Sequence, residues 1–239
     1  MRKLMAVWLL LPFMGVSQVK NVVSAERYFP KMDKILDFEK ALAAHAQKYH
    51  TGDWKWRVFE IQSGPDAGGF QVNEGPNSWD QVDNRGNLGA EHMNDWNKNV
   101  AVFLTDRYVA TYATYEEELS TIQLTDYTAR IAITHVFPKP GCGDKVEDLI
   151  KKIKKAWVAG NQTVAVYSAA SSGPQQYLLV TRYKQGLKER EKGFRKPFKD
   201  RYEAEYGAGS YESYMKTIGE ISDNVWAEIL FARPDLGSK

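Results

Sequence analysis

Five charged or titratable side chains interrupt apolar segments of this 239-residue sequence, and their types could support ligand binding. They are Arg27, Glu60, His135, Arg182 and Glu228. Each stands in a stretch where apolar residues alternate with others, as in a β-strand with one buried face. A charge buried without a partner is too costly to persist. These side chains therefore either reach solvent at a rim or face one another around a pocket, and our hypothesis is the pocket.

Aromatic residues close to these strands could wall such a pocket. The wall candidates are Trp54, Trp56, Trp79, Tyr167 and Tyr183. Apolar walls with a few polar groups are typical of small-molecule sites, so we predict a small hydrophobic or aromatic ligand. The four histidines are scattered along the sequence, and we expect no metal site, which would need clustered ligands. No nucleophile–base pair is visible, so the sequence leaves open whether the protein is an enzyme.

Two short motifs recur at nearly one spacing. Phe-Pro-Lys occurs at 29–31 and 137–139, and Ser-Gly-Pro occurs at 63–65 and 172–174. Arg27 and His135 are separated by the same offset as the Phe-Pro-Lys motifs. The proline of each Phe-Pro-Lys ends a predicted strand, because proline cannot donate to a strand ladder, and Ser-Gly-Pro marks the turn of a hairpin. The spacing indicates an internal duplication.

Each half shows the same predicted order of elements: a strand, a helix, two strands joined by the hairpin, a second helical stretch and a closing strand. The second helical stretches are at 88–105 and about 187–219, and the closing strands are near 107–119 and at 224–234. This order is the split βαβ arrangement of a ferredoxin-like unit. We therefore predict an α+β fold of two tandem ferredoxin-like (βαββαβ) units, over 18–126 and 127–239.

Fused tandem units of this kind resemble the dimeric α/β-barrel superfamily, in which two sheets face each other and close into a barrel. The superfamily includes antibiotic-biosynthesis-type monooxygenases, haem-degrading monooxygenases and muconolactone isomerase-like proteins. The segment AEHMNDWNKNVAVFL at 90–104 also resembles exported bacterial proteins of this type. The resemblance implies helices outside the barrel and a lumen lined by the five inward-facing residues.

The resemblance also implies two activities to set beside plain ligand binding: haem binding or degradation, and cofactor-light oxygenation. In haem-degrading relatives an axial histidine lies on a helix beside the cavity. His92 is the corresponding haem-ligand candidate here, whereas His45 lies on an apolar helix stripe and is interpreted as a core residue. Without haem, we expect no cofactor.

The first residues are typical of a secretory signal peptide. Arg2 and Lys3 precede an apolar run at 4–14, and small residues follow up to Ser17, where we expect cleavage. The protein is then exported, either periplasmic or secreted. No later segment reaches the roughly 20 apolar residues that a membrane-spanning helix needs.

The net charge and the single cysteine indicate which kinds of partner and which cross-links to expect. The formal net charge is +2, which gives no electrostatic footprint for nucleic acid, and the lysines at 151–155 form the solvated face of an amphipathic helix. The single cysteine, Cys142, excludes an internal disulfide and is interpreted as a tolerated loop residue. Duplication can satisfy sheet pairing internally, so we expect a monomer or a homodimer.

Overall fold

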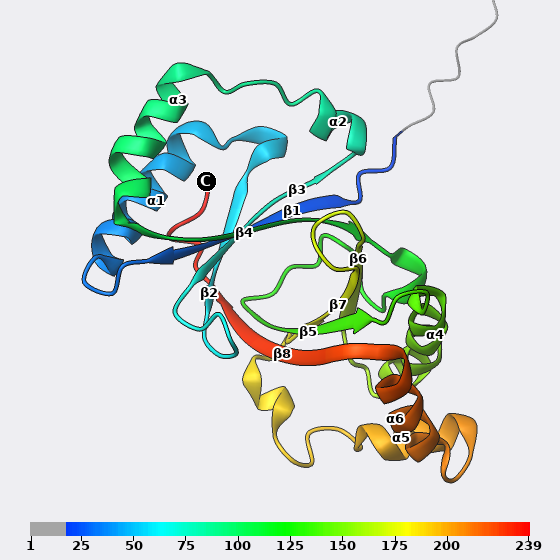
Figure 1. Cartoon of the computed structure of the whole chain (residues 1–239). Helices are drawn as coiled ribbons and strands as arrows, with labels where there is room; N and C mark the ends of the chain where they lie inside the picture. Colours follow the sequence, from blue (N-terminus) through cyan, green and yellow to red (C-terminus); the bar gives the residue numbers. More distant parts are fainter. Residues whose placement is uncertain (1–17) are drawn as a thin grey trace, which may run out of the picture.

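The computed structural model describes residues 18–239 and has an α+β architecture. The signal-peptide prediction for 1–17 lies outside the described residues. Eight strands are present in the described chain (Figure 1): β1 Val22–Pro30, β2 Trp56–Ile61, β3 Phe70–Asn77, β4 Leu104–Tyr115, β5 Arg130–Pro138, β6 Val164–Ala169, β7 Gln176–Arg182 and β8 Ser222–Ala232. Its α-helices are α1 Ile35–Tyr49, α2 Trp79–Asp83, α3 Gly89–Asp95, α4 Gly143–Ala159, α5 Phe198–Tyr206 and α6 Ser210–Ile221.

The strands form one closed barrel in the order β1-β3-β2-β8-β5-β7-β6-β4, and every pairing is antiparallel. The order around the first half is β4-β1-β3-β2, and around the second half it is β8-β5-β7-β6. The two halves join where β2 pairs with β8 and where β4 pairs with β6. The predicted hairpins are confirmed, because β2 pairs with β3 and β6 pairs with β7.

Local sequence signals account for several element ends. Strands β1 and β5 both end at a proline, Pro30 and Pro138, as expected for a residue without a backbone donor. In the helical stretch expected at about 187–219, α-helix begins only at Phe198, and Gly207 and Gly209 divide it into α5 and α6. Their φ angles are +91° and +78°, in the left-handed region that glycine adopts without strain.

Helices cover the outside of the barrel in two groups (Figure 1). Helices α1 and α3 lie over the first half, and α4, α5 and α6 lie over the second half. The described chain accordingly has three hydrophobic cores: one beneath each helix group and one inside the barrel. Strands packed on both faces need apolar residues at successive positions, which blurs the alternation expected of a strand with one exposed face.

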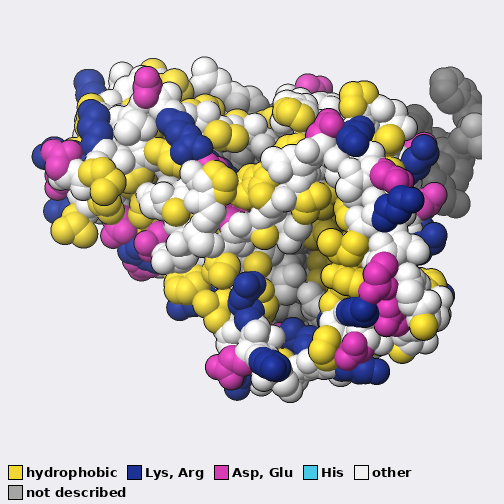
Figure 2. Space-filling view, turned by 60° about the horizontal axis from the view of Figure 1, so that its bottom comes forward, with side chains coloured by type: hydrophobic (Ala, Val, Ile, Leu, Met, Phe, Trp, Pro, Cys, Tyr) yellow, Lys and Arg dark blue, Asp and Glu magenta, His cyan; other side chains and the backbone are white. Residues whose placement is uncertain are grey.

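The surface carries charges of both signs. On the face shown in Figure 2, Lys and Arg are interspersed with Asp and Glu, and the face is hollowed beside hydrophobic side chains. Among residues 18–239, no helix has the length and apolar character needed to cross a membrane.

Candidate functional site

Three of the five residues predicted to face inward meet at one end of the barrel lumen. Arg27 on β1 donates from Nη2 to Oε1 of Glu228 at 2.5 Å and from Nη1 to Oε2 at 3.2 Å. Nε2 of His135 lies 2.9 Å from the same Oε1. Arg27 also contacts Asp66, at 2.5 Å, and Gln71, at 2.8 Å. The Glu228 side chain is fully buried, so the group is a compensated ion network of the kind that buried charges require.

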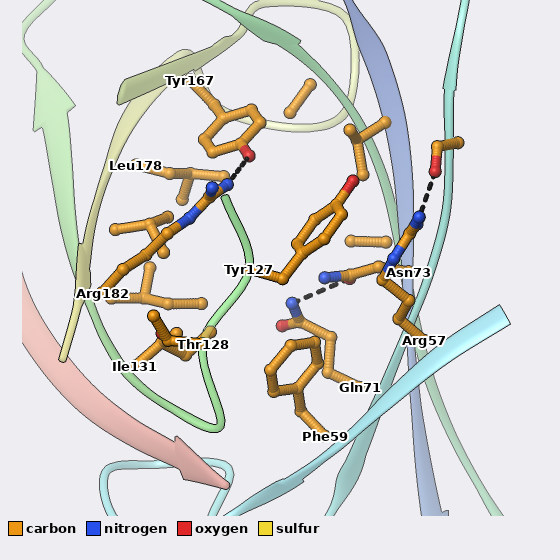
Figure 3. A pocket seen from close by; sticks show the side chains of 16 residues that line it. Arg57, Phe59, Gln71, Asn73, Tyr127, Thr128, Ile131, Tyr167, Leu178 and Arg182 are labelled. Atoms are coloured by element: carbon orange, nitrogen blue, oxygen red, sulfur yellow. Dashed lines mark hydrogen bonds between the residues drawn. The ribbon is translucent and has the colours of Figure 1, made fainter. Parts of the chain in front are cut away.

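Arg182, the fourth of the five, faces the other end of the lumen (Figure 3). Its Nη1 donates to the backbone carbonyls of Gln123, Leu124 and Asp126 at 2.9–3.0 Å, and its Nη2 donates to the Tyr167 hydroxyl at 2.8 Å. Tyr127 lies near Arg182 in the same pocket. These hydrogen bonds of Arg182 therefore hold the segment between β4 and β5 in place at this end of the lumen.

The lumen itself is small. The pocket drawn in Figure 3 has a volume of about 70 Å³ and is mostly apolar. Drug-sized and cofactor sites have volumes of roughly 300–1,000 Å³. The predicted polar-centred lumen cavity is therefore largely filled by its own side chains.

The other predicted residues are not brought into the lumen group. Glu60 is half-exposed and lies 3.2 Å from Nη1 of Arg233. Trp54 lies beneath the guanidinium of Arg85. Trp56 belongs to the hydrophobic core under α1, which also contains Phe38 of that helix. Two further wall candidates lie away from the lumen: Trp79 is exposed beside Tyr112, and Tyr183 accepts a hydrogen bond from Arg190. The remaining candidate, Tyr167, does line the lumen.

Three of the four histidines converge outside the barrel, between the first-half sheet and its helices. His45 lies on α1, His50 follows the C-terminus of α1, and His92 lies on α3. Nε2 of His92 is 3.1 Å from Nε2 of His45 and 3.3 Å from Nε2 of His50. One nitrogen from each ring lies within 4.8 Å of the other two. The expectation that the histidines are scattered is wrong for these three.

Two carboxylates stand behind the imidazoles. Oδ2 of Asp95 lies 2.7 Å from Nδ1 of His45, and Oε2 of Glu74 lies 3.4 Å from Nδ1 of His50. Glu74 is buried, and it accepts from Nε1 of Trp56 at 3.1 Å and from Nη2 of Arg85 at 2.6 Å. The Trp56 ring stacks on His50 with centroids 3.5 Å apart. These contacts fix the orientation of the rings.

Burial controls the protonation of the three rings. Burial lowers the pKa of His45, His50 and His92 below the usual value of histidine, although the hydrogen bond to Asp95 opposes the effect at His45. The imidazoles are therefore neutral at pH 7, and each neutral ring keeps one nitrogen lone pair. The arrangement can accept a cation or pass a proton between rings.

A cleft of about 530 Å³ opens beside the histidines. His50 and His92 form part of its wall, together with the aromatic side chains of Tyr28, Trp56, Trp96 and Tyr108 and the polar side chains of Glu26, Arg85 and Arg107. The Tyr28 ring lies 5.1 Å from that of Trp96 and 5.6 Å from that of Tyr108, centroid to centroid. The volume falls within the range of small-molecule sites.

The polar groups of this cleft are held in place by neighbours. Tyr28 donates a hydrogen bond to Glu26, and Arg107 is paired with Asp66. Burial, aided by the Glu26 carboxylate, raises the pKa of Tyr28 and of Tyr108, so both phenols stay protonated. The cleft thus presents aromatic faces with one carboxylate and two guanidinium groups at fixed positions.

Solved structures share this architecture at low sequence identity. A candidate monooxygenase from Fusobacterium nucleatum has 13% identity and a TM-score of 0.53, covering 88% of this chain and 91% of its own. A candidate monooxygenase from Lactobacillus acidophilus has 11% identity and a TM-score of 0.51, covering 91% and 95%. An anthrone oxidase-like protein has 10% identity and a TM-score of 0.54, covering 90% and 92%.

The chain shares the fold of these proteins, a closed barrel of eight antiparallel strands with helices outside it, which is consistent with the expected dimeric α/β-barrel fold. No protein-family model matches the chain, and no curated protein matches its sequence. The shared fold does not identify the activity, because one fold hosts many activities.

Proposed function

We propose that the chain is an exported protein that binds a small aromatic ligand beside its barrel, in the cleft between α3 and the outer face of the first-half sheet. The observation that carries the proposal is the contrast in volume. The lumen offers about 70 Å³, and the outer cleft offers about 530 Å³ with four aromatic walls. The ligand site thus lies outside the barrel.

The cleft chemistry favours a flat ligand with a polar substituent. Aromatic walls such as Tyr28 and Trp96 stack against planar rings, and each such contact contributes about 0.5–1.5 kcal/mol beyond area burial. The Glu26 carboxylate accepts from a hydroxyl or amine of the ligand, and Arg85 and Arg107 favour an acidic or electron-rich group. Phenolic and aromatic-acid compounds combine these features.

The test uses 8-anilinonaphthalene-1-sulfonate, an aromatic anion that accepts energy from tryptophan. Trp56 and Trp96 line the cleft, so a bound probe quenches their emission. Tyr108 and Tyr112 are both exposed, on one strand and four residues apart, but only Tyr108 lines the cleft. Tyr108→Ala should raise the Kd of the probe about tenfold, equivalent to about 1.4 kcal/mol of binding free energy. Tyr112→Ala should change the Kd of the probe less than twofold.

Equal effects of the two substitutions, or a native protein that does not bind the probe, would refute the cleft as the ligand site. Native mass spectrometry of protein from its own compartment complements the test, because a retained small molecule identifies the ligand class directly. Edman sequencing of the same material tests export: the mature chain should begin near Gln18.

Oxygenase chemistry on an aromatic ligand is the second candidate function. The observation that favours it is the aromatic cleft beside three imidazoles, in a fold shared with two candidate monooxygenases and an anthrone oxidase-like protein. The predicted axial role of His92 does not fit haem, because Nε2 of His92 is in contact with Nε2 of His45 and with Nε2 of His50. We therefore propose no haem-dependent step.

The tandem organisation is also part of this proposal. The matching strand orders of the two halves, β4-β1-β3-β2 and β8-β5-β7-β6, support ferredoxin-like units over 18–126 and 127–239 that arose by duplication. The barrel would then close within one chain, where single-unit relatives close it by dimerising. A folded monomer in sedimentation equilibrium would agree with this reading.

A further inference from the structure

Three imidazole nitrogens point at one another in the histidine cluster of His45, His50 and His92. A carboxylate oxygen accepts from Nδ1 of His45, so the proton of this neutral ring lies on Nδ1 and the Nε2 lone pair faces His92. Nδ1 of His50 is turned towards Glu74, which leaves its Nε2 facing His92 in the same way. A single N–H on His92 cannot be directed at both acceptors.

A cation placed between the rings removes this conflict. We propose that His45, His50 and His92 form a binding site for one divalent first-row transition-metal ion. Imidazole nitrogen suits iron, copper, nickel, cobalt and zinc, whereas magnesium and calcium take oxygen ligands.

The spacing of the nitrogens agrees with such a site. Bonds of 2.0–2.1 Å to one tetrahedral ion place the ligand nitrogens about 3.3 Å apart. The observed separations are 3.1 Å for His45–His92 and 3.3 Å for His50–His92, and no pair exceeds 4.8 Å. Two of the three nitrogen–nitrogen separations therefore already suit a bound ion. The third, between His45 and His50, needs to shorten by at most about 1.5 Å.

The surroundings match those of metal-binding histidines. Such histidines usually donate their second ring N–H to a carboxylate, which fixes the tautomer and raises the basicity of the ligand nitrogen. Asp95 has this position behind His45, and Glu74 stands behind His50. Nδ1 of His50 makes no hydrogen bond within the described chain, and it lies 3.4 Å from Oε2 of Glu74.

The site has a free side. His50 and His92 belong to the wall of the cleft, so an ion held by the three rings keeps a coordination position open to it. Three protein ligands with an open position are characteristic of catalytic rather than structural zinc sites. If the cleft binds the ligand proposed above, a hydroxyl or carboxylate of that ligand can reach the ion; this step rests on the proposed function, but metal binding does not.

The experiment is a metal titration of tag-free protein, since a polyhistidine tag binds the same ions. Protein treated with EDTA and desalted is titrated with Co²⁺ while visible d–d absorption is recorded, and Zn²⁺ is then added as a competitor. The native chain should bind one equivalent of Co²⁺ and release it to Zn²⁺. His92→Ala should bind at least 100-fold more weakly, and Asp95→Asn about 10- to 100-fold more weakly.

His135→Gln is the matched control, because His135 is the one histidine of the described chain that lies apart from the cluster, inside the barrel beside Glu228. It should bind Co²⁺ like the native chain. Far-UV circular dichroism in EDTA establishes that each variant is folded. Native protein without Co²⁺ absorption and without Zn²⁺ binding, or a folded His92→Ala that binds as tightly as the native chain, would overturn the proposal. Probe binding to the EDTA-treated protein separates this failure from that of the cleft.

Discussion

Replacing Glu228 by glutamine tests whether the inward-facing charges stabilise the barrel. The Glu228 carboxylate is fully buried and contacts Arg27 through both oxygens and His135 through one. Glutamine keeps the shape of the side chain but removes the charge, so Arg27 loses one of its two carboxylate partners and keeps Asp66. Breaking a buried ion pair costs about 3–5 kcal/mol.

The remaining contact of Arg27 with Asp66 puts the expected loss at the lower end, about 3 kcal/mol of unfolding free energy. For a chain of this size, that loss lowers the melting temperature by about 6–12 °C. The assay is urea unfolding followed by circular dichroism, with the slope m compared between variants so that a change in midpoint reports stability.

Glu60→Gln is the matched control, since it makes the same chemical change on another strand of the barrel. The Glu60 side chain is 35% exposed in its ion pair with Arg233, and an ion pair of this kind contributes about 0–1 kcal/mol. Equal losses for Glu228→Gln and Glu60→Gln would show that the buried network stabilises the barrel no more than a surface ion pair does.

Three further predictions concern stability. Gly64→Ala should destabilise the protein by about 1–3 kcal/mol more than Gly68→Ala in urea unfolding, because both glycines have positive φ but only the added Cβ at Gly64 meets the Cβ of Glu228, at 2.9 Å; equal losses would contradict the contact. Arg182→Met should lower the unfolding free energy by about 2–4 kcal/mol and speed amide hydrogen exchange at 120–129, because the carbonyls of that segment lose their donor. Unchanged exchange at 120–129 would contradict the idea that Arg182 holds this segment in place. Burial raises the pKa of Tyr214 to about 12. The protonated phenol therefore contributes its full share of the unfolding free energy below pH 10, and this share falls as the pH rises from 10 towards 12. Tyr214→Phe should reduce the fall in urea midpoints measured at pH 8, 10 and 11.

The order of strands and helices along the chain, the two hairpins and several lumen residues could be predicted from the sequence. The paired prolines and the Ser-Gly-Pro turns mark real ends and hairpins, since backbone donors and turn geometry act locally. Alternation within strands also placed Arg27, His135 and Glu228 on one face, and the structure brings them together.

Alternation failed for Glu60, for a physical reason. Strand β2 packs against the lumen core on one face and the α1 core on the other, so Val58 and Phe59 are both buried although they point in opposite directions. A strand covered on both sides carries no clear inward–outward pattern. Without that pattern, the half-exposed position of Glu60 could not be told from an inward one.

The histidine cluster could not be found from spacing. His45 and His50 are five residues apart, a separation that does not place two side chains on one helix face; they meet because α1 ends at Tyr49 and His50 leaves the helix. His92 reaches them only through the packing of α3 on the first half of the barrel. The one local signal was Asp95, an acidic residue three positions after a histidine, which now stands behind His45.

The most direct test of metal binding by the histidine cluster is an anomalous difference map from crystals of tag-free protein soaked in Zn²⁺ and measured on both sides of the zinc absorption edge. A zinc ion bound by the cluster should give one strong peak about 2.0–2.1 Å from the ring nitrogens of His45, His50 and His92, on the side open to the aromatic cleft. A map without a peak there, with the three rings in hydrogen-bond contact only, would contradict metal binding by the cluster.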